Sequence, residues 1–377
     1  MELRVERDAL ADAVVWTARS LPARPPMQVL LGLLLEVGAD EGGLSVSGFD
    51  YEVSSQISVD VSVKEPGRVL VPGRLLSDIV RSLPAQPVDL RLEGNRVVLN
   101  CGAARFTLPT LPVEDYPALP AMPTVAGSID SDVFATAVAQ VALAAGRDDT
   151  LPVLTGVRVE IEGDQLTLAA TDRYRLAVRT LTWKPEQSDL SVTALIPART
   201  LADTAKALTA AAEVTVALST PGSGEGMIGF EGGGRRTTSR LLEGEFPKYR
   251  SLLPSESSAF AEIATAPLVE AVKRVALVAA RNAPVRLGFS ADGLVLEAGG
   301  QDEAQASEQL ECGWEGEAMS IAFNPQYLLD GLGAVDSEST TLSFTAPTRP
   351  AVLTGKRPTA GEVADYRYLL MPVRLSG

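Results

Sequence analysis

The feature that most constrains this chain is a segment that occurs three times. VPGRLLSDIV at residues 71–80 is followed by IPARTLADTA at 196–205 and by NPQYLLDGL at 324–332. In each copy a proline opens a run of periodic apolar residues, and proline is favoured in the first turn of a helix, where its missing N–H costs little. The three segments therefore predict three equivalent short helices.

Each of these helices belongs to a longer repeated unit. Upstream of it, residues spaced i, i+4 and i+7, all apolar except one threonine, predict a first amphipathic helix. These residues are Leu10, Val14 and Thr17, then Phe134, Val138 and Val141, then Leu268, Val272 and Val275. Alternating apolar residues then predict half-buried strands at 44–50, 166–172 and 294–300. We predict three tandem α+β domains, at residues 1–122, 127–254 and 260–377.

Composition removes most enzymatic classes. The chain has no histidine, which excludes histidine-based general bases, nucleophile triads and zinc sites. It has no phosphate-binding GxxxxGK[ST] motif, and Gly232 to Gly234 lie between two strand-like segments, which indicates a turn. Cys101 and Cys312 lack metal-ligand spacing. We predict no catalytic residue, no metal and no cofactor.

The expected location is the cytoplasm. No apolar run approaches the roughly 20 residues that span a bilayer, the first residues do not resemble a secretory signal, and two cysteines make a disulfide framework improbable. We therefore expect no association with membranes.

The distribution of positive charge is the strongest functional signal before any resemblance is considered. The net charge is −15, yet Arg74 and Arg81 of the first repeat recur in register as Arg199 and Lys206 of the second. Basic residues also gather at the ends of the first helices. Equivalent helices therefore present basic faces to one shared partner, for which a polyanion is the natural candidate. The predicted DNA-facing residues are Arg24, Arg74, Arg81, Arg147, Arg199, Lys206, Lys273, Arg274 and Arg281.

Simple geometry shows what such repeats can build. Similar units joined head to tail can close into a ring. Two chains would supply six domains of two helices each, and twelve axes spaced roughly 10 Å apart describe a circle about 38 Å across. The thickness of the helices leaves about 28 Å clear, which admits B-form DNA loosely.

Three stretches carry a resemblance to a known family. ATDRYRLAV at 170–178, EGEFPKYRSLLP at 243–254 and LLMPVRL at 369–375, on three repeated domains, resemble the bacterial DNA polymerase III β subunit, the replicative sliding clamp. The resemblance implies three DNA-clamp domains with two helices lining a pore and antiparallel sheets outside. It also implies a head-to-tail homodimer that forms a six-domain ring around duplex DNA, without sequence specificity and without catalysis.

The resemblance further implies partners and a site for them. The expected partners are the α subunit of the replicative polymerase, the clamp loader complex, translesion polymerases, mismatch repair proteins and ligase. Their short Gln-, Leu- and Phe-containing motifs would bind a hydrophobic pocket between the second and third domains. The implied pocket residues are Leu154, Thr171, Arg173, Tyr174, Arg175, Leu176, Pro247, Leu252, Leu370, Met371, Pro372, Val373, Arg374 and Leu375.

A subunit interface is implied in the same way. It would join the edge strand ARFTLP of the first domain to a helix end in the third, with charges of opposite sign on the two sides. The implied interface residues are Arg96, Arg105, Phe106 and Leu108 on one side and Leu277, Val278, Asp302 and Glu303, with Glu308 nearby, on the other.

Two other functions are compatible with the residues. A protein-binding scaffold of the same repeats would never encircle DNA, and its basic residues would form an ordinary solvated face. A hydrolase could use carboxylates such as Asp50 and Asp172, although the third repeat has Gly300 at that position. The in-register basic residues favour the clamp.

Overall fold

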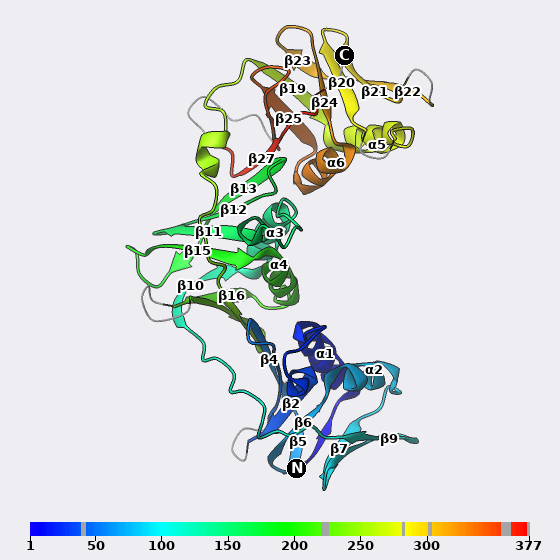
Figure 1. Cartoon of the computed structure of the whole chain (residues 1–377), viewed down its shortest axis with the longest axis vertical. Helices are drawn as coiled ribbons and strands as arrows, with labels where there is room; N and C mark the ends of the chain where they lie inside the picture. The colour runs from blue at the N-terminus through cyan, green and yellow to red at the C-terminus, as the bar shows by residue number, and fades with distance from the viewer. Residues whose placement is uncertain (39–42, 220–225, 281–282, 301–303, 356–362, 375–377) are drawn as a thin grey trace. The chain divides into compact units, whose positions relative to one another are not determined.

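The order of elements repeats three times along the chain (Figure 1). The computed structural model describes residues 1–38, 43–219, 226–280, 283–300, 304–355 and 363–374. Within these residues each repeat has one strand, a helix, five strands, a second helix and three strands. The α-helices are α1 Arg7–Thr17, α2 Gly73–Ser82, α3 Ser131–Ala142, α4 Ala198–Ala207, α5 Thr265–Ala276 and α6 Pro325–Ala334. Short 3₁₀ helices are η1 Ala18–Ser20, η2 Gln28–Leu31, η3 Pro152–Thr155 and η4 Tyr249–Leu252.

The helices bury the apolar stripes that the sequence predicts. In the first helix of each repeat all nine predicted stripe residues are buried. Thr17, the one polar member, satisfies its hydroxyl by donating to the carbonyl of Ala13 at 2.8 Å. The periodicity therefore identified the buried face of each helix correctly.

The chain forms two compact units. The first comprises residues 1–134, 184–187 and 203–241, and the second comprises residues 135–183, 188–202 and 242–377. The boundary between the units passes through α3 and α4. Among the described residues, the strand pairings in both units are antiparallel, as expected for an α+β fold.

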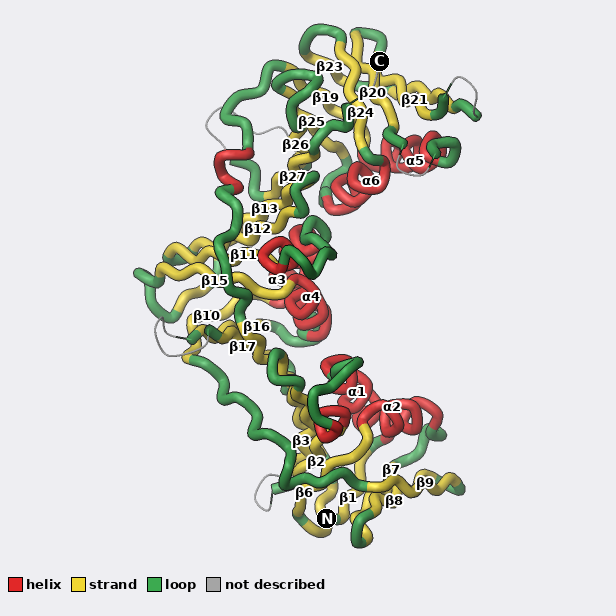
Figure 2. The backbone as a smooth tube through the Cα atoms, in the orientation of Figure 1, coloured by secondary structure: helices red, strands yellow, loops and turns green. Residues whose placement is uncertain are grey.

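Unit 1 contains two sheets. One has the order β5-β1-β7-β8-β9 and the other β14-β10-β16-β17-β18-β4-β3-β2-β6. Helices α1 and α2 pack against each other and against β2, β3, β4 and β6 (Figure 2). The strands are β1 Glu2–Val5, β2 Gly32–Val37, β3 Gly43–Phe49, β4 Val53–Asp60, β5 Ser62–Glu65, β6 Gly67–Pro72, β7 Val88–Glu93, β8 Arg96–Cys101, β9 Ala104–Pro109, β10 Thr124–Asp130, β14 Lys184–Pro185, β16 Glu213–Leu218, β17 Met227–Gly232 and β18 Arg235–Arg240.

Unit 2 also contains two sheets. Their orders are β15-β11-β12-β13-β27-β26-β25-β19-β23 and β22-β21-β20-β24. Helices α5 and α6 pack against each other, and α6 also contacts β27. The strands are β11 Gly156–Glu162, β12 Gln165–Thr171, β13 Arg175–Thr182, β15 Ser191–Pro197, β19 Ala259–Ala264, β20 Val285–Ser290, β21 Gly293–Ala298, β22 Ala306–Leu310, β23 Gly313–Glu315, β24 Met319–Phe323, β25 Ser339–Phe344, β26 Ala351–Thr354 and β27 Tyr366–Leu370.

Consecutive repeats share their sheets. The last strand of the second repeat, β18, pairs with the fourth strand of the first, β4. In the same way β27, the last strand of the third repeat, pairs with β13, the fourth strand of the second (Figure 2). We call these two strand pairs the internal junctions. Each nine-stranded sheet is therefore built from parts of two repeats.

The glycine turn, the two cysteines and the lengths of the helices were also subjects of expectations from the sequence. Gly233 and Gly234 have φ of 57° and 76° and form the turn between β17 and β18, as predicted. Cys101 and Cys312 are free thiols. No helix in the described part of the chain combines the length and apolarity needed to cross a bilayer.

Candidate peptide-binding site

A tight turn between β12 and β13 positions the first residues of the site. Oδ1 of Asp172 accepts hydrogen bonds from the backbone N–H groups of Tyr174 at 3.0 Å and Arg175 at 3.1 Å. Arg173, which lies between Asp172 and Tyr174, has a φ of 80°, in the left-handed region that favours glycine. The aspartate therefore fixes the turn and leaves Arg173 and Tyr174 exposed at its tip.

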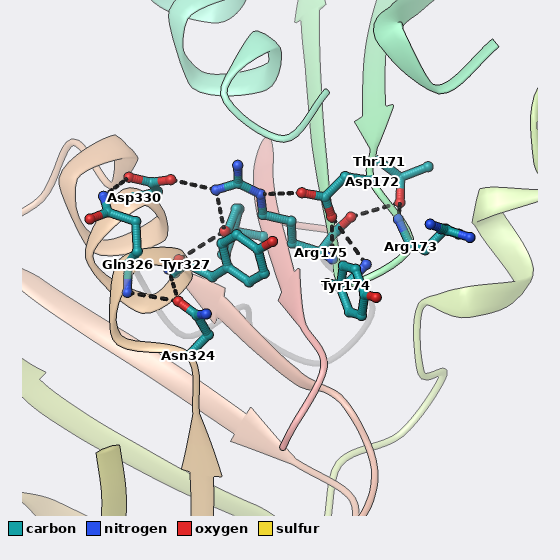
Figure 3. A network of polar contacts seen from close by, with 10 residues as sticks. Thr171, Asp172, Arg173, Tyr174, Arg175, Asn324, Gln326, Tyr327 and Asp330 are labelled. Atoms are coloured by element: carbon teal, nitrogen blue, oxygen red, sulfur yellow. Dashed lines mark hydrogen bonds and ion pairs between the residues drawn. The ribbon is translucent and has the colours of Figure 1, made fainter. Parts of the chain in front are cut away.

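Arg175 is the centre of a buried polar network that joins β13 to α6 (Figure 3). Its side chain is 6% exposed, and its guanidinium forms ion pairs with Asp172, at 2.9 Å from Nε, and with Asp330. The guanidinium also lies 4.4 Å from the ring centroid of Tyr327 and 3.5 Å from the hydroxyl of Tyr368. Burial disfavours the charged form, but these partners outweigh it and raise the pKa of Arg175.

The start of α6 is fixed by a side-chain cap. Oδ1 of Asn324 accepts hydrogen bonds from the N–H groups of Gln326 at 2.9 Å and Tyr327 at 3.2 Å, and Pro325 occupies the first helical position. Nε2 of Gln326 donates to Asp330 at 2.8 Å. The cap therefore places Tyr327 and Asp330 one turn apart, beside Arg175.

A cavity of about 560 Å³ lies between this network and the loop that follows α3. Tyr174 and Tyr327 stack along it, with ring centroids 6.1 Å apart and planes inclined at 26°. Leu151 and Leu154 add apolar surface. The full lining is Ala145, Gly146, Arg147, Asp148, Leu151, Leu154, Asp172, Arg173, Tyr174, Arg175, Gln326, Tyr327 and Asp330.

The C-terminal segment runs beside the same turn. The N–H of Met371 donates to the carbonyl of Tyr174 at 2.9 Å, and the N–H of Val373 donates to the carbonyl of Ala322 at 2.8 Å. Met371 is 41% exposed and Val373 is 37% exposed. Exposed apolar side chains of this size add an adaptable surface next to the cavity.

The segment between β18 and β19 covers a neighbouring part of the sheet. Phe246 and Tyr249 are buried in one apolar cluster with Leu176 and Leu369. Leu252, at the end of η4, remains 50% exposed. This segment therefore contributes core residues and one large exposed apolar side chain.

The implied pocket residues fall into three groups. Leu154, Arg173, Tyr174 and Arg175 line the cavity. Pro247, Leu252, Met371, Val373 and Arg374 are exposed outside it, and Pro372 is half-buried. Thr171, Leu176 and Leu370 are 4%, 1% and 0% exposed and act as supporting core. Leu375 lies outside the described residues.

The sequence did not identify Gln326, Tyr327 and Asp330 as part of this site. In α6 Tyr327 stands at the position of Arg74 and Arg199, and Asp330 stands at the position of Ser77 and Ala202. The available signal was that α6 has no basic residue of its own, so that a cationic partner for Asp330 had to come from elsewhere in the fold. That partner is Arg175, 155 positions away along the chain.

Comparison with known proteins identifies the family. Models of the DNA polymerase III β subunit match consecutive parts of the chain, with the N-terminal domain at residues 1–120, the central domain at 128–248 and the C-terminal domain at 250–374. The chain belongs to the DNA polymerase III β subunit family. The fold class predicted from the sequence, three tandem clamp domains with antiparallel sheets, is confirmed.

Individual relatives agree over the full length. The chain is 62% identical to the β sliding clamp of Streptomyces coelicolor, with complete coverage of both chains, and 45% identical to the clamp homologue GriR of Streptomyces muensis, with 99% coverage of both. It is also similar to the griselimycin-bound clamp of Pseudomonas aeruginosa, with a TM-score of 0.91 and 29% identity over all of both chains. The predicted function, a sliding clamp that acts as a DNA polymerase processivity factor, is confirmed at the level of the family.

The basic residues predicted to face DNA in this clamp are exposed wherever the structure describes them. Arg274 pairs with Glu308 at 2.6 Å, and Lys273 pairs with Glu270 at 2.7 Å, so those two are partly neutralised. The exposed residues are Arg24, Arg74, Arg81, Arg147, Arg199, Lys206, Lys273 and Arg274. Arg281 lies outside the described residues, and Arg147 also lines the cavity.

The residues predicted at the subunit interface of the clamp differ in exposure. Leu277 is 84% exposed at the end of α5, whereas Leu108 is 1% exposed and belongs to the core of unit 1. Phe106 is half-buried against the same core. Arg96 and Arg105 are exposed, Val278 is half-buried, and Asp302 and Glu303 lie outside the described residues.

Proposed function

We propose that two copies of the chain close into a ring by pairing the edge strands β9 and β22. Among the described residues, β9 is the last strand of its five-stranded sheet and β22 the last of its four-stranded sheet. In the repeat, β9 corresponds to β18 and β27, and β22 corresponds to β4 and β13. A β9–β22 pair between copies would complete the series of internal junctions, and this observation carries the proposal.

The two internal junctions have equivalent registers. Thr237 pairs with Ser55 in the first, and Tyr368 pairs with Ala177 in the second. Thr237 and Tyr368 hold the same position in their last strands, as Ser55 and Ala177 do in their fourth strands. Two copies of one register inside a chain support the same register for a third.

Equivalent backbone hydrogen bonds flank these pairs. The N–H of Arg240 donates to the carbonyl of Glu52 in the first junction, and the N–H of Met371 donates to that of Tyr174 in the second, both at 2.9 Å. The alternation along an antiparallel ladder makes the Thr237 pair and its equivalent non-hydrogen-bonded pairs, whose side chains lie closer together.

The repeat transfers this register to the proposed subunit contact. Phe106 holds the position of Thr237 in its hairpin, and Ala306 holds that of Ser55, so Phe106 would lie opposite Ala306. Pro109 holds the position of Arg240. Since proline has no N–H, the subunit contact would lack one backbone bond that both internal junctions have.

One exposed side chain near the edge of the third repeat supports the same contact. In the proposed register Arg105 would lie opposite Ser307, and Glu308, which pairs with Arg274 within the chain, would lie opposite Ala104. These two charged side chains would point to opposite faces of the sheet, so the proposal does not depend on a charge pair between them. Leu277, 84% exposed in the single chain, would be covered in such a dimer.

The ring would enclose duplex DNA through the helices of three domains per chain, with boundaries at residues 1–122, 127–254 and 260–377. Exposed basic residues on α2 and α4, at equivalent positions in a chain of net charge −15, support a positive inner surface. The contacts would be to phosphates and independent of sequence. We assign the clamp no catalytic step, and we place it in the cytoplasm with the replication machinery.

Topological linkage gives a direct test. The protein, loaded by its clamp loader on a nicked circular duplex, should stay bound through gel filtration and be lost once the circle is cut. Charge neutralisation of Arg74 and Arg199 should speed sliding without abolishing linkage. Equal loss from circular and linear DNA would refute the ring.

We propose that the cavity and the exposed C-terminal side chains bind short apolar motifs of partner proteins. These partners would be the polymerase α subunit, the clamp loader, translesion polymerases, mismatch repair proteins and ligase. The stacked pair of Tyr174 and Tyr327, with Leu154 and Met371 near it, offers aromatic and flexible apolar surface to such motifs. The griselimycin-bound clamp of Pseudomonas aeruginosa supports a ligand site in this fold.

Truncating exposed residues tests the pocket without damaging the core. Tyr174→Ala and Met371→Ala should each weaken binding of a Gln-, Leu- and Phe-containing peptide by about five- to thirtyfold, measured by fluorescence anisotropy. Leu176 is 1% exposed, so its truncation would test folding instead. Val363→Ala, at a residue 64% exposed and outside the cavity lining, is the control. Equal affinities in all three variants would place the site elsewhere.

A further inference from the structure

The rim of the cavity carries two exposed arginines whose side chains are not tied into the Arg175 network. Arg147 and Arg173 both line the cavity and are exposed. In the described part of the chain neither guanidinium has a hydrogen bond or an ion pair, whereas Arg175 is held by Asp172 and Asp330. Figure 3 shows the Arg173 side chain directed away from the Arg175 network.

The fold does not require an arginine at position 173. The equivalent turn of the first repeat has the same construction, with Asp50 accepting N–H bonds at 2.9 and 2.7 Å and Tyr51 at a φ of 76°. A tyrosine is therefore sufficient for this turn, and glycine would suit its left-handed backbone better. An exposed cation at a backbone position that favours glycine, with no hydrogen bond or ion pair to its guanidinium among the described residues, is available to a ligand.

The rim of the cavity carries more positive than negative charge. Asp148 is the one acidic lining residue outside the Arg175 network, and its side chain accepts hydrogen bonds from the N–H and hydroxyl of Thr150 at 3.0 and 2.6 Å. Those bonds lower the pKa of Asp148, and the charge of Arg173 adds to the effect. Two arginines against one aspartate leave the rim positive in a strongly acidic protein.

We propose that Arg147 and Arg173 select partner peptides that carry an acidic side chain next to their apolar anchors. This inference rests on the peptide-binding function proposed above and specifies the class of peptide. The apolar part of the lining, Leu151 and Leu154 with the two stacked tyrosines, would hold the anchors while the arginines pair with the carboxylate. A peptide uses both surfaces at once, whereas a nucleic acid backbone would use only the charge.

The test compares two labelled peptides that differ in one side chain, a carboxylate in one and an amide in the other. Each contains the Gln-, Leu- and Phe-containing motif, with either Glu or Gln at a flanking residue, and both flanks are tried. Fluorescence anisotropy at low salt should show the wild-type clamp binding the better Glu peptide about two- to fivefold more tightly than its Gln partner. The preference should shrink as salt screens it.

Variants of opposite sign make the test specific. Arg173→Gln should remove most of the preference, Arg173→Glu should reverse it toward a Lys peptide, and Asp148→Asn should enlarge it. Arg68→Gln removes an exposed positive charge on β6 in unit 1 and should change nothing. Circular dichroism of each variant checks that the fold is retained.

Three other results of the peptide-binding test would each contradict a different statement. If the wild type binds the Gln peptide as tightly as the Glu peptide, the acidic preference is wrong and the peptide site stands. If neither peptide binds, both proposals for the cavity fail. If a single-stranded oligonucleotide displaces the Glu peptide and loses more affinity than the peptide does in Arg173→Gln, the arginines serve nucleic acid instead.

Discussion

The internal junctions β4–β18 and β13–β27 share a backbone register and differ in their side chains. At the first, the hydroxyls of Ser54 and Thr238 meet at 2.6 Å in the middle of a buried sheet. At the second, Arg175 begins β13 and pairs with two carboxylates, at the position where β4 begins with Val53. The repeated backbone therefore sets the geometry, and the side chains decide which junction also carries a binding site.

The largest effect is expected at the proposed contact between β9 and β22 of two copies, which would have the same register as the two internal junctions. In a background with Cys101→Ala and Cys312→Ser, the pair Phe106→Cys and Ala306→Cys should oxidise to a covalent dimer in high yield. Directly opposed non-hydrogen-bonded positions bring Cβ atoms close enough for a disulfide. Non-reducing electrophoresis measures the yield.

A shifted pair is the control for that register. Phe106→Cys with Ser307→Cys should give little covalent dimer, because neighbouring residues on a strand point to opposite faces. More dimer from the shifted pair than from the direct pair would show that the subunit contact does not copy the internal junctions.

Arg175→Met should destabilise the second junction by about 3–5 kcal/mol, because Asp172 and Asp330 would remain partly buried without their cation. Denaturant unfolding followed by tryptophan fluorescence measures the loss. Val53→Met changes the equivalent position of the first junction and should cost less than about 1.5 kcal/mol. Similar losses in the two variants would mean that the Arg175 network adds no stability of its own.

The first junction should respond more weakly. Ser54→Ala removes one buried hydroxyl–hydroxyl bond and should cost about 1 kcal/mol, with Thr238→Ala giving a similar value. The double variant should cost less than the sum, because both changes remove the same bond. Strict additivity in the unfolding midpoints would show that the two hydroxyls do not interact.

The smallest effects are expected at the two left-handed turn residues. Arg173→Gly should stabilise the chain by about 0.5–1 kcal/mol, since relief of the left-handed strain exceeds the entropy that glycine adds to the unfolded state. Tyr51→Gly should gain less, because it also removes a ring that packs on Phe49 at 5.4 Å between centroids. Thermal unfolding compares the two. A stabilised Arg173→Gly clamp that binds acidic peptides less well would separate the needs of the turn from those of the ligand.

Much of this fold could be predicted because side-chain periodicity reports burial directly. The stripe residues Leu10, Phe134 and Leu268 were identified from spacing alone, and all are buried. The sharing of sheets between repeats could not be predicted in the same way. Backbone pairing at a junction leaves no side-chain signature: Ser54 opposite Thr238 resembles any pair of strand residues.

The site was only partly predictable for a related reason. The resemblance placed Leu108 at the subunit interface and Leu176 in the peptide pocket, yet each is 1% exposed. The sequence could not separate these cases, because a core leucine and a pocket leucine have the same chemistry. Asp330 could not be linked to Arg175 from the sequence, since their contact depends on how α6 meets β13. Local patterns predict elements, whereas contacts between distant elements require the tertiary structure.

Because of Pro109, the contacts that hold the proposed ring together would not be equally strong. A proline at the end of β9 cannot donate the backbone hydrogen bond that both internal junctions make. We therefore expect the contact between copies to separate before the internal junctions within each copy do. Such a built-in point of opening would let a closed circle admit DNA and reseal without unfolding any domain. Pro109→Ala should then slow the exchange of subunits between labelled rings, and exchange at an unchanged rate would show that the weakness lies elsewhere.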